Sequence, residues 1–340
     1  MLFGFNAPLR AAGFEAVEKT FRVDWAALRS LEVGMPAAAP AGVRSLSGMM
    51  RDASKGNEFS APPGTQDYRI GDEWGKMPVT KDALQSGSAV FQRAAKATAY
   101  YGSATAFYLG KFNGRHIMAT NYHVSGSRCK GSVRFYFSQK SFPCVAVYGS
   151  WKEVDLALFS IKVPPADEAA LLELGRNFAY DSPIYPGQEL LTVGFGVAAN
   201  PRQQQLMANQ DSDCKVFSDA GDFRLIADPD EVNPGGYSAW SFANGCDVSH
   251  GDSGSAFIDR KTGDVLGLVW TGKIPKSKKV GSSAYLDGVF RGRGPEIWTE
   301  LTFSVPAAKI REHIRKVLAA SPPDADTVKT LSAVIGSTAA

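Results

Sequence analysis

Short apolar runs separated by turn residues dominate the chain between residues 89 and 303. Glycine and proline, with 34 and 19 residues, supply many of the turns. Because no helical pattern alternates with the runs, they predict an all-β fold, an antiparallel sandwich or barrel rather than a parallel sheet. The clearest runs are residues 104–109, 116–120, 133–137, 144–148, 156–161, 190–194 and 265–270.

The first 85 residues have a different pattern. A stretch with helical spacing is followed by a linker rich in alanine and proline at residues 35–42, and then by a polar segment. We interpret residues 1–85 as a partly flexible N-terminal extension: a pro-segment, an arm packed on the main domain, or a partner-binding piece. The apolar positions of the expected helix are Phe14, Val17, Phe21, Trp25 and Leu28.

A second helix is expected near the C-terminus. Pro306 stands near its start, and Ile310, Ile314 and Leu318 form an apolar stripe through residues 307–319. Residues 321–340 are mostly small or polar, with two prolines, and we expect this C-terminal tail to fray. The main domain is therefore predicted over residues 86–320.

The charge pattern argues against a nucleic-acid partner. The formal net charge is +3, and no block of lysine and arginine forms a basic arm; residues 273–279, the most basic stretch, are interpreted as a solvated loop. No run approaches the ~18–20 apolar residues of a membrane span. No signal peptide is visible after Met1, so we expect a protein that is not exported or whose signal lies outside this sequence.

The four cysteines fall into two pairs that are close in sequence. None belongs to a C-x-x-C motif, and no histidine lies at a zinc-like spacing from them. Nearness favours the disulfides Cys129–Cys144 and Cys214–Cys246 among three possible pairings. The alternative is four free, buried thiols in a cytosolic protein. Disulfides favour a secreted or periplasmic location.

A glycine-rich turn around Ser253 is the strongest candidate for chemistry. Residues 250–256 read H-G-D-S-G-S-A and lead into an apolar run. A glycine before a nucleophile allows backbone angles that turn an N–H toward an oxyanion, and a glycine after it lets an acyl group approach. The alternative is an ordinary turn between strands.

A histidine and an aspartate beside predicted strands complete a possible catalytic set. His123 follows the 116–120 run in a polar turn, where its imidazole can face a cleft, although a single histidine there is usually structural. Asp155 opens the 156–161 run, and unless it faces solvent its carboxylate needs a partner such as a histidine N–H. The other histidines are poorer candidates by position: His116, His250 and His313.

The order of these residues along the chain narrows the class of enzyme. An α/β-hydrolase places its serine first and its histidine last, with a glycine two residues after the serine. Here the order is His123, Asp155, Ser253, and Ser255 occupies the place of that glycine. An esterase of that fold is therefore disfavoured.

Three segments resemble the catalytic blocks of trypsin-like serine peptidases: residues 120–124 (TNYHV), 155–158 (DLAL) and 251–255 (GDSGS). The bacterial branch, which includes the V8-type glutamyl endopeptidases, is the most similar. Residues 186–196 resemble the strand that opens the second barrel of that branch, and residues 263–272 resemble the strand that pairs with bound peptide. The resemblance covers residues 89–319.

This resemblance implies two six-stranded antiparallel β-barrels with the active site between them. It implies that Asp155 supports His123, that His123 deprotonates Ser253, and that an acyl-enzyme forms. The backbone N–H groups of Gly251 and Ser253 would form the oxyanion hole. No metal or cofactor is expected, because serine acyl transfer needs neither.

The resemblance also implies substrate-binding residues. Main-chain groups near Thr271 and Gly272 would hold the substrate as an added strand, and His250 is a further candidate. Asp247 would be the acidic base of a pocket for arginine or lysine.

The sequence departs from the family in several places. Val269 replaces the histidine with which V8-type enzymes bind glutamate, which argues against glutamate specificity. The cysteine positions differ from those of mammalian trypsins, and no animal-type activation site is evident near residue 89. How Asp252 is held is therefore an open question.

We predict a serine endopeptidase that acts on protein or peptide substrates. One alternative is a trypsin-fold pseudo-enzyme or binding module silenced by its N-terminal extension. Another is an unrelated β-rich interaction protein. A chain that begins near residue 89 and gains activity would favour a blocked zymogen. The sequence does not indicate an oligomeric state.

Overall fold

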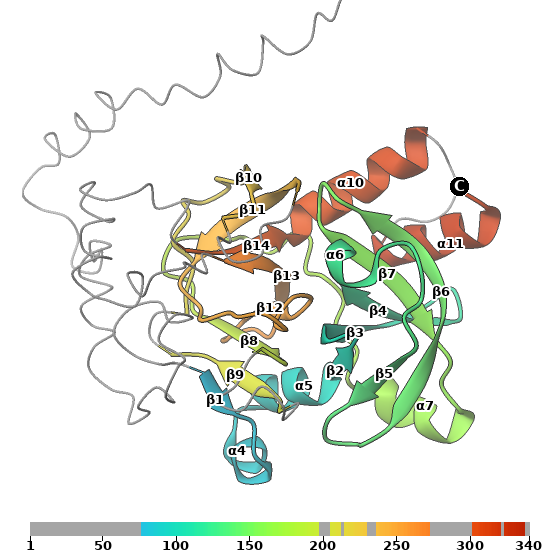
Figure 1. Cartoon of the computed structure of the whole chain (residues 1–340), viewed down its shortest axis with the longest axis horizontal. Coiled ribbons are helices and arrows are strands. Elements are labelled where there is room, and N and C mark those ends of the chain that lie inside the picture. The colour runs from blue at the N-terminus through green and yellow to red at the C-terminus, as the bar shows by residue number, and fades with distance from the viewer. Residues whose placement is uncertain are drawn as a thin grey trace, which may run out of the picture. The chain divides into compact units, whose positions relative to one another are not determined.

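Two β-structures, a closed barrel and a larger sheet, make up most of the described chain (Figure 1). The computed structural model describes residues 76–196, 205–211, 214–229, 236–272, 301–320 and 323–336. The helix expected between Phe14 and Leu28 and the loop expected at residues 273–279 lie outside these ranges.

The barrel has six antiparallel strands in the order β2-β3-β4-β7-β6-β5. Its interior is filled by aromatic and aliphatic side chains, among them Tyr101 and Phe159, whose rings stack with centroids 4.6 Å apart. Thr120 at the end of β4 pairs with Ala157 at the start of β7, so the segments that follow β4 and precede β7 emerge together. The strands are β2 Thr98–Tyr101, β3 Ala104–Phe112, β4 Arg115–Thr120, β5 Ser132–Phe135, β6 Ser141–Trp151 and β7 Leu156–Ile161.

The second β-structure differs from the six-stranded barrel that we expected. In the described residues it is an eight-stranded sheet in the order β1-β9-β8-β12-β13-β14-β11-β10. The sheet is larger because β1 adds to β9 at one end and β10 adds to β11 at the other. Its strands are β1 Lys76–Pro78, β8 Leu190–Gly194, β9 Met207–Asn209, β10 Arg224–Ala227, β11 Ser238–Asn244, β12 Ala256–Asp259, β13 Val265–Gly272 and β14 Thr302–Pro306.

Strand β1 lies within the segment that we interpreted as an extension. Lys76 pairs with Asn209, and the N–H of Val79 donates a hydrogen bond to the carbonyl of Leu206 at 2.9 Å. Pro78 is accommodated because β1 is an edge strand. The last residues of the predicted extension are therefore part of the sheet.

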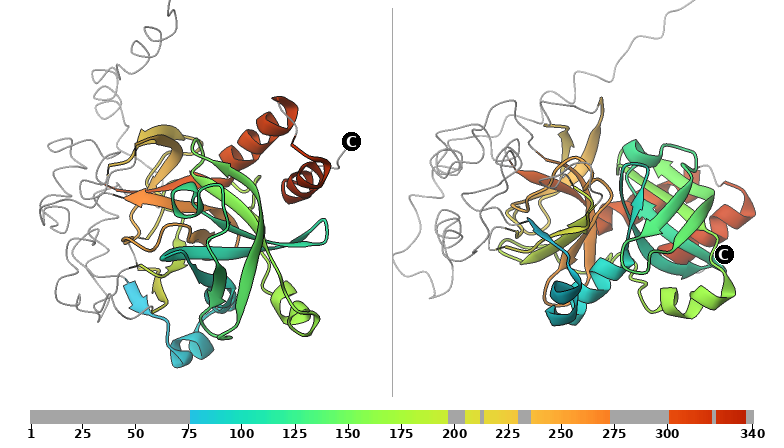
Figure 2. Two further views of the ribbon diagram at one scale, coloured as in Figure 1. Left: turned by 45° about the vertical axis from the view of Figure 1, so that its right-hand side comes forward. Right: turned by 60° about the horizontal axis from the view of Figure 1, so that its bottom comes forward.

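Helices cover the outside of the two β-structures (Figure 2). The expected C-terminal helix is confirmed as α10. The expectation that the tail frays is wrong for α11, because Asp324 caps that helix and Leu331 and Val334 are buried. No helix in the described ranges has both the length and the apolar character to cross a membrane. The helices are α4 Lys81–Ser86, α5 Ala89–Ala97, α6 Tyr122–Ser125, α7 Pro165–Leu172, α10 Ala307–Ala320 and α11 Ala325–Val334.

Both predicted disulfides are present. Cys129–Cys144 ties the segment after α6 to β6, and Cys214–Cys246 ties the segment after β9 to the segment after β11. Two disulfides are compatible with an extracellular or periplasmic location.

Candidate active site

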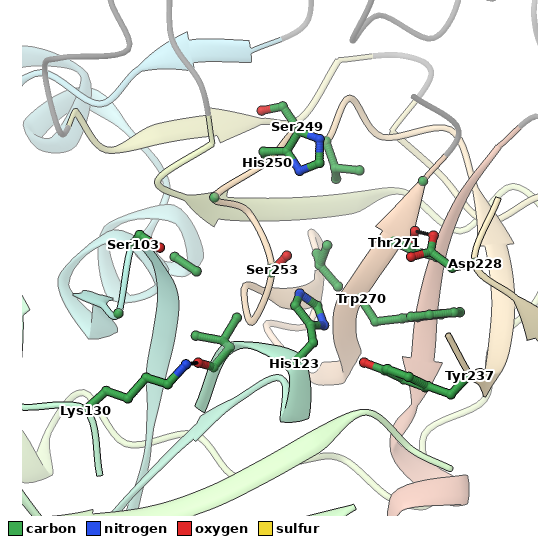
Figure 3. Close-up of a pocket in the computed structure, with 17 residues that line it drawn as sticks. Ser103, His123, Lys130, Asp228, Tyr237, Ser249, His250, Ser253, Trp270 and Thr271 are labelled. Carbon is green, nitrogen blue, oxygen red and sulfur yellow. Dashed lines mark hydrogen bonds between the residues drawn. The ribbon is translucent and has the colours of Figure 1, made fainter. Parts of the chain in front are cut away.

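A cavity of about 420 Å³ is lined by residues of both the barrel and the sheet. The barrel contributes the β2–β3 turn, His123 of α6 and Lys130. The sheet contributes residues 248–251, Ser253 and the end of β13. Figure 3 shows both His123 and Ser253 among the side chains that line this cavity. Of the predicted substrate-binding residues, His250, Thr271 and Gly272 line it as well.

His123 and Asp155 form a close pair beside the cavity. The Nδ1 atom of His123 lies 2.8 Å from Oδ2 of Asp155, and the backbone N–H of His123 donates to Oδ1 at 3.1 Å. Asp155 is fully buried and has a φ of 32°, a region that non-glycine residues rarely adopt. The Asn121 side chain donates to the Asp155 carbonyl at 2.9 Å and helps to hold this backbone in place.

Tyr237 is a third member of this group that the sequence analysis missed. Its hydroxyl donates a hydrogen bond to Oδ1 of Asp155 at 2.7 Å. Burial and the neighbouring Asp155 carboxylate raise the pKa of the Tyr237 phenol well above its ordinary value of 10. The phenol therefore stays protonated near neutral pH and acts as a donor. No local spacing marks this residue, which is 82 positions from Asp155.

The imidazole of His123 binds a proton more tightly than a free histidine does. Burial works to lower its pKa, but the charge of Asp155 and the hydrogen bond to Asp155 outweigh burial. The pKa of His123 is therefore raised above its ordinary value of 6.5. Such a group can accept a proton near neutral pH and hold it as an ion pair.

The loop that carries Ser253 presents two unused N–H groups. Within the described residues, the amides of Gly251 and Ser253 donate no hydrogen bond, whereas those of Asp252, Gly254 and Ser255 each donate to a backbone carbonyl at 2.8–3.2 Å. Gly251 has a φ of +102°, and a Cβ there would lie 2.5 Å from the carbonyl oxygen of Phe195. Glycine is therefore required for this backbone shape.

Thr105 fastens the loop that carries Ser253 to the barrel. Its N–H donates to the Ser253 carbonyl at 3.0 Å, and its hydroxyl donates to the Gly251 carbonyl at 2.7 Å. The loop thus has a fixed position relative to α6. The hydroxyl of Ser253 makes no hydrogen bond to His123 in the described structure, although both line the cavity.

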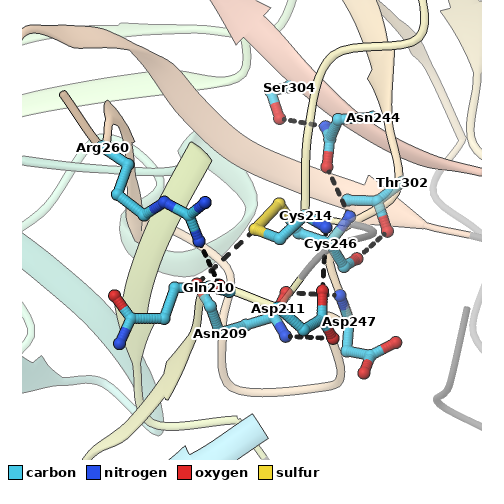
Figure 4. The surroundings of a disulfide bond; sticks show 10 residues. All are labelled: Asn209, Gln210, Asp211, Cys214, Asn244, Cys246, Asp247, Arg260, Thr302 and Ser304. Carbon is cyan, nitrogen blue, oxygen red and sulfur yellow. Dashed lines mark hydrogen bonds between the residues drawn. A yellow bond between two sulfur atoms is a disulfide. The ribbon is translucent and has the colours of Figure 1, made fainter. Parts of the chain in front are cut away.

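Asp247 is not among the residues that line the cavity. It is fully buried next to the Cys214–Cys246 disulfide, and its backbone N–H donates a hydrogen bond to the side-chain oxygen of Asn209 at 2.9 Å (Figure 4). Among the described residues, the carboxylate that lines the cavity belongs to Asp228, which follows β10 and accepts a hydrogen bond from the Thr271 hydroxyl. Sequence reasoning missed Asp228, because an isolated aspartate in a polar segment gives no signal.

Residues 104–268 match the family model of the trypsin-like peptidase domain, which supports a peptidase. No curated protein matches the sequence. The chain is similar to the inactive form of the Rv3671c protease of M. tuberculosis, with 18% identity and a TM-score of 0.44 over 71% of this chain and 96% of that one. It is also similar to the HtrA-type protease AlgW with a tripeptide, with 16% identity and a TM-score of 0.41 over 68% of this chain and 63% of that one.

Proposed function

We propose that this protein is a serine endopeptidase in which Ser253 is the nucleophile, His123 the general base and Asp155 the residue that orients His123. The observation that carries the proposal is the contact of His123 with the buried Asp155, at 2.8 Å, beside the cavity that His123 and Ser253 both line. The two unused N–H groups of the loop support it, since acyl transfer needs donors for an oxyanion.

The proposed reaction begins with proton transfer from the Ser253 hydroxyl to Nε2 of His123. The other ring nitrogen, Nδ1, carries a hydrogen that it donates to Asp155, so Nε2 is the atom that can accept a proton. The serine oxygen bonds to the substrate carbonyl carbon, and the carbonyl oxygen becomes an oxyanion bound by the N–H groups of Gly251 and Ser253. The C–N bond then breaks, and His123 gives its proton to the leaving amine. Water, deprotonated by His123, cleaves the acyl-enzyme in the same manner and restores the serine hydroxyl.

The end of β13 offers a place for an extended substrate. Strand β12 pairs with β13 only as far as Leu268, whereas β14 continues along the other side to Gly272. One side of residues 270–272 is thus not paired by β12, and these residues line the cavity. An extended peptide can add there as a further strand.

We propose further that the enzyme prefers a substrate with arginine or lysine near the scissile bond. Asp228, rather than Asp247, is the carboxylate that lines the cavity, and it is only half-buried. A carboxylate that a substrate must cover favours a cationic side chain. A secreted or periplasmic location and an N-terminal extension over residues 1–75 complete the proposal.

The test is cleavage of a peptide panel, varied on both sides of the scissile bond, by the wild type and by Ser253→Ala. Loss of the serine should reduce kcat by ~10⁶-fold. If both proteins cleave equally or not at all, the peptidase proposal fails, and a silent pair of proteins would favour the pseudo-enzyme alternative.

The preference for arginine or lysine is tested with separate variants. Asp228→Asn should reduce kcat/KM for cationic peptides by ~10-fold or more and leave neutral peptides little changed. Asp222→Asn, a change at a partly exposed residue that precedes the same strand, is the matched control. An unchanged preference in Asp228→Asn would exclude Asp228 as the specificity residue.

A further inference from the structure

A buried ion pair lies directly beside the nucleophile. The ammonium of Lys76, in β1, contacts Oδ2 of Asp252, and the side chains are 1% and 2% exposed. Lys76 also donates to the Ser249 hydroxyl at 2.9 Å. The carboxylate of Asp252 accepts further hydrogen bonds from the N–H groups of Gly196, at 2.9 Å, and Ser249, at 2.8 Å. This network answers how Asp252 is held.

The surrounding sequence leaves room for this pair. A Cβ at Gly196 would overlap both the Lys76 ammonium and the Asp252 carboxylate. A Cβ at Gly194 would lie 2.7 Å from Oδ1 of Asp252. The absence of a side chain at Gly194 and Gly196 thus provides the space that the two charged groups occupy.

Asp252 connects the ion pair to the reactive part of the loop. Its N–H donates to the Ser249 carbonyl at 2.9 Å, and its own carbonyl accepts from the Ser255 N–H at 2.8 Å. These bonds form the turn in which Gly251 and Ser253 flank Asp252. A charge buried without its partner is strongly destabilised, so removal of Lys76 would force the carboxylate to move toward water and would carry the turn with it.

We infer that Lys76 is a positioning residue for the nucleophile loop: its buried ion pair with Asp252 holds the N–H groups of Gly251 and Ser253 in the arrangement that binds an oxyanion. The catalytic part of this inference rests on the proposed function. It also changes the expected activity of a chain that lacks the N-terminal residues. A chain that begins near residue 89 lacks Lys76 and should lose activity rather than gain it.

The test uses the full chain with Lys76→Met, Lys76→Arg and the control Lys111→Met, which breaks an ion pair with Glu168 on the barrel surface. We expect Lys76→Met to lower kcat by ~10²–10³-fold, as loss of an oxyanion donor does, with little change in KM. Lys76→Arg should recover part of the loss, and Lys111→Met should match the wild type.

Hydrogen exchange gives a readout that does not need activity. In Lys76→Met the amides of residues 249–255 should exchange at least ~10-fold faster, while those of β3 and β4 stay protected. Wild-type kcat and wild-type exchange in a folded Lys76→Met would overturn the inference. If the wild type cleaves no peptide, the proposed function fails, and exchange alone decides whether Lys76 orders the loop.

A second variant covers the case in which Lys76→Met does not fold. Lys76→Met combined with Asp252→Asn removes both charges, so no unpaired charge is buried. We expect this protein to fold and to show fast exchange at residues 249–255 with reduced kcat. Failure of the double variant to fold, or wild-type kcat and exchange in it, would overturn the positioning role.

Discussion

The carboxylate of Asp155 holds His123 at two points, the ring and the main chain. Oδ2 lies 2.8 Å from Nδ1 of the imidazole, and Oδ1 accepts the backbone N–H of the same residue at 3.1 Å. One side chain therefore fixes both the position of α6 and the direction of its imidazole. In the proposed mechanism, this contact also decides which ring nitrogen carries the hydrogen.

Replacement of Asp155 by asparagine should separate these roles. An amide of the same shape can still accept from the backbone N–H, but its NH₂ group facing Nδ1 favours the wrong tautomer. We expect kcat to fall by ~10³–10⁴-fold with little change in KM, measured by steady-state peptide cleavage. Asp264→Asn, a control on the sheet surface, should retain activity. A wild-type kcat in Asp155→Asn would contradict the assigned role.

The raised pKa of His123 predicts the acid limb of the pH profile. The base must be neutral, so kcat/KM should fall as the pH drops through the pKa of His123, with a midpoint above 6.5. The raised pKa of His123 also contributes to the free energy of unfolding. This contribution is fully present below pH 6.5 and is lost as the pH rises through the pKa of His123 in the folded protein. In Asp155→Asn the midpoint should move down, because the two interactions with Asp155 that raise the pKa of His123 are lost while burial still lowers it. An imidazole NMR titration with a midpoint at or below 6.5 in the wild type would contradict this.

Tyr237→Phe should reduce the activity less than Asp155→Asn does, and the loss should depend on pH. The phenol donates to Oδ1 of Asp155, and a hydrogen bond to a charged group is worth about 1.5–3 kcal/mol. Without it the Asp155 carboxylate attracts the His123 proton more strongly, so the acid limb should move to higher pH. We expect kcat/KM to fall by ~10-fold at pH 7 and to recover partly at pH 8.5. A uniform loss at both pH values would indicate a packing defect instead.

The sequence predicted the His123–Asp155 pair because its signals are local. Each residue adjoins an apolar run, and the pairing of Thr120 with Ala157 brings the ends of those runs together. The contacts of Lys76 with Asp252 and of Tyr237 with Asp155 join segments 176 and 82 residues apart. The spacing of residues along the chain does not predict such contacts, because they depend on which segments become neighbours in the folded protein.

Among the helices that the sequence analysis missed, α5 and α11 both begin at a capping residue that the sequence shows. Ser88 caps α5 by accepting from the Phe91 N–H at 3.2 Å, and Phe91 and Ala94 form part of its buried face. The equivalent cap of α11 is Asp324. The α5 segment adjoins many short β-like runs, and the α11 segment lies in a tail with prolines and small residues. Both contexts favoured other structures over these short helices. Their burial against the β-structures stabilises helices that have little stability alone.

Removal of the Cys214–Cys246 disulfide should destabilise the sheet. Both cysteines are buried, and their bond closes a segment with a sequence separation of 32. Loop-closure entropy predicts a loss of about 3–4 kcal/mol for Cys214→Ser combined with Cys246→Ser, measured by urea unfolding at pH 7. The Cys129–Cys144 bond, with a separation of 15, should contribute about 3 kcal/mol and provides the comparison. Unchanged stability in both double variants would mean that the bonds do not constrain the unfolded chain.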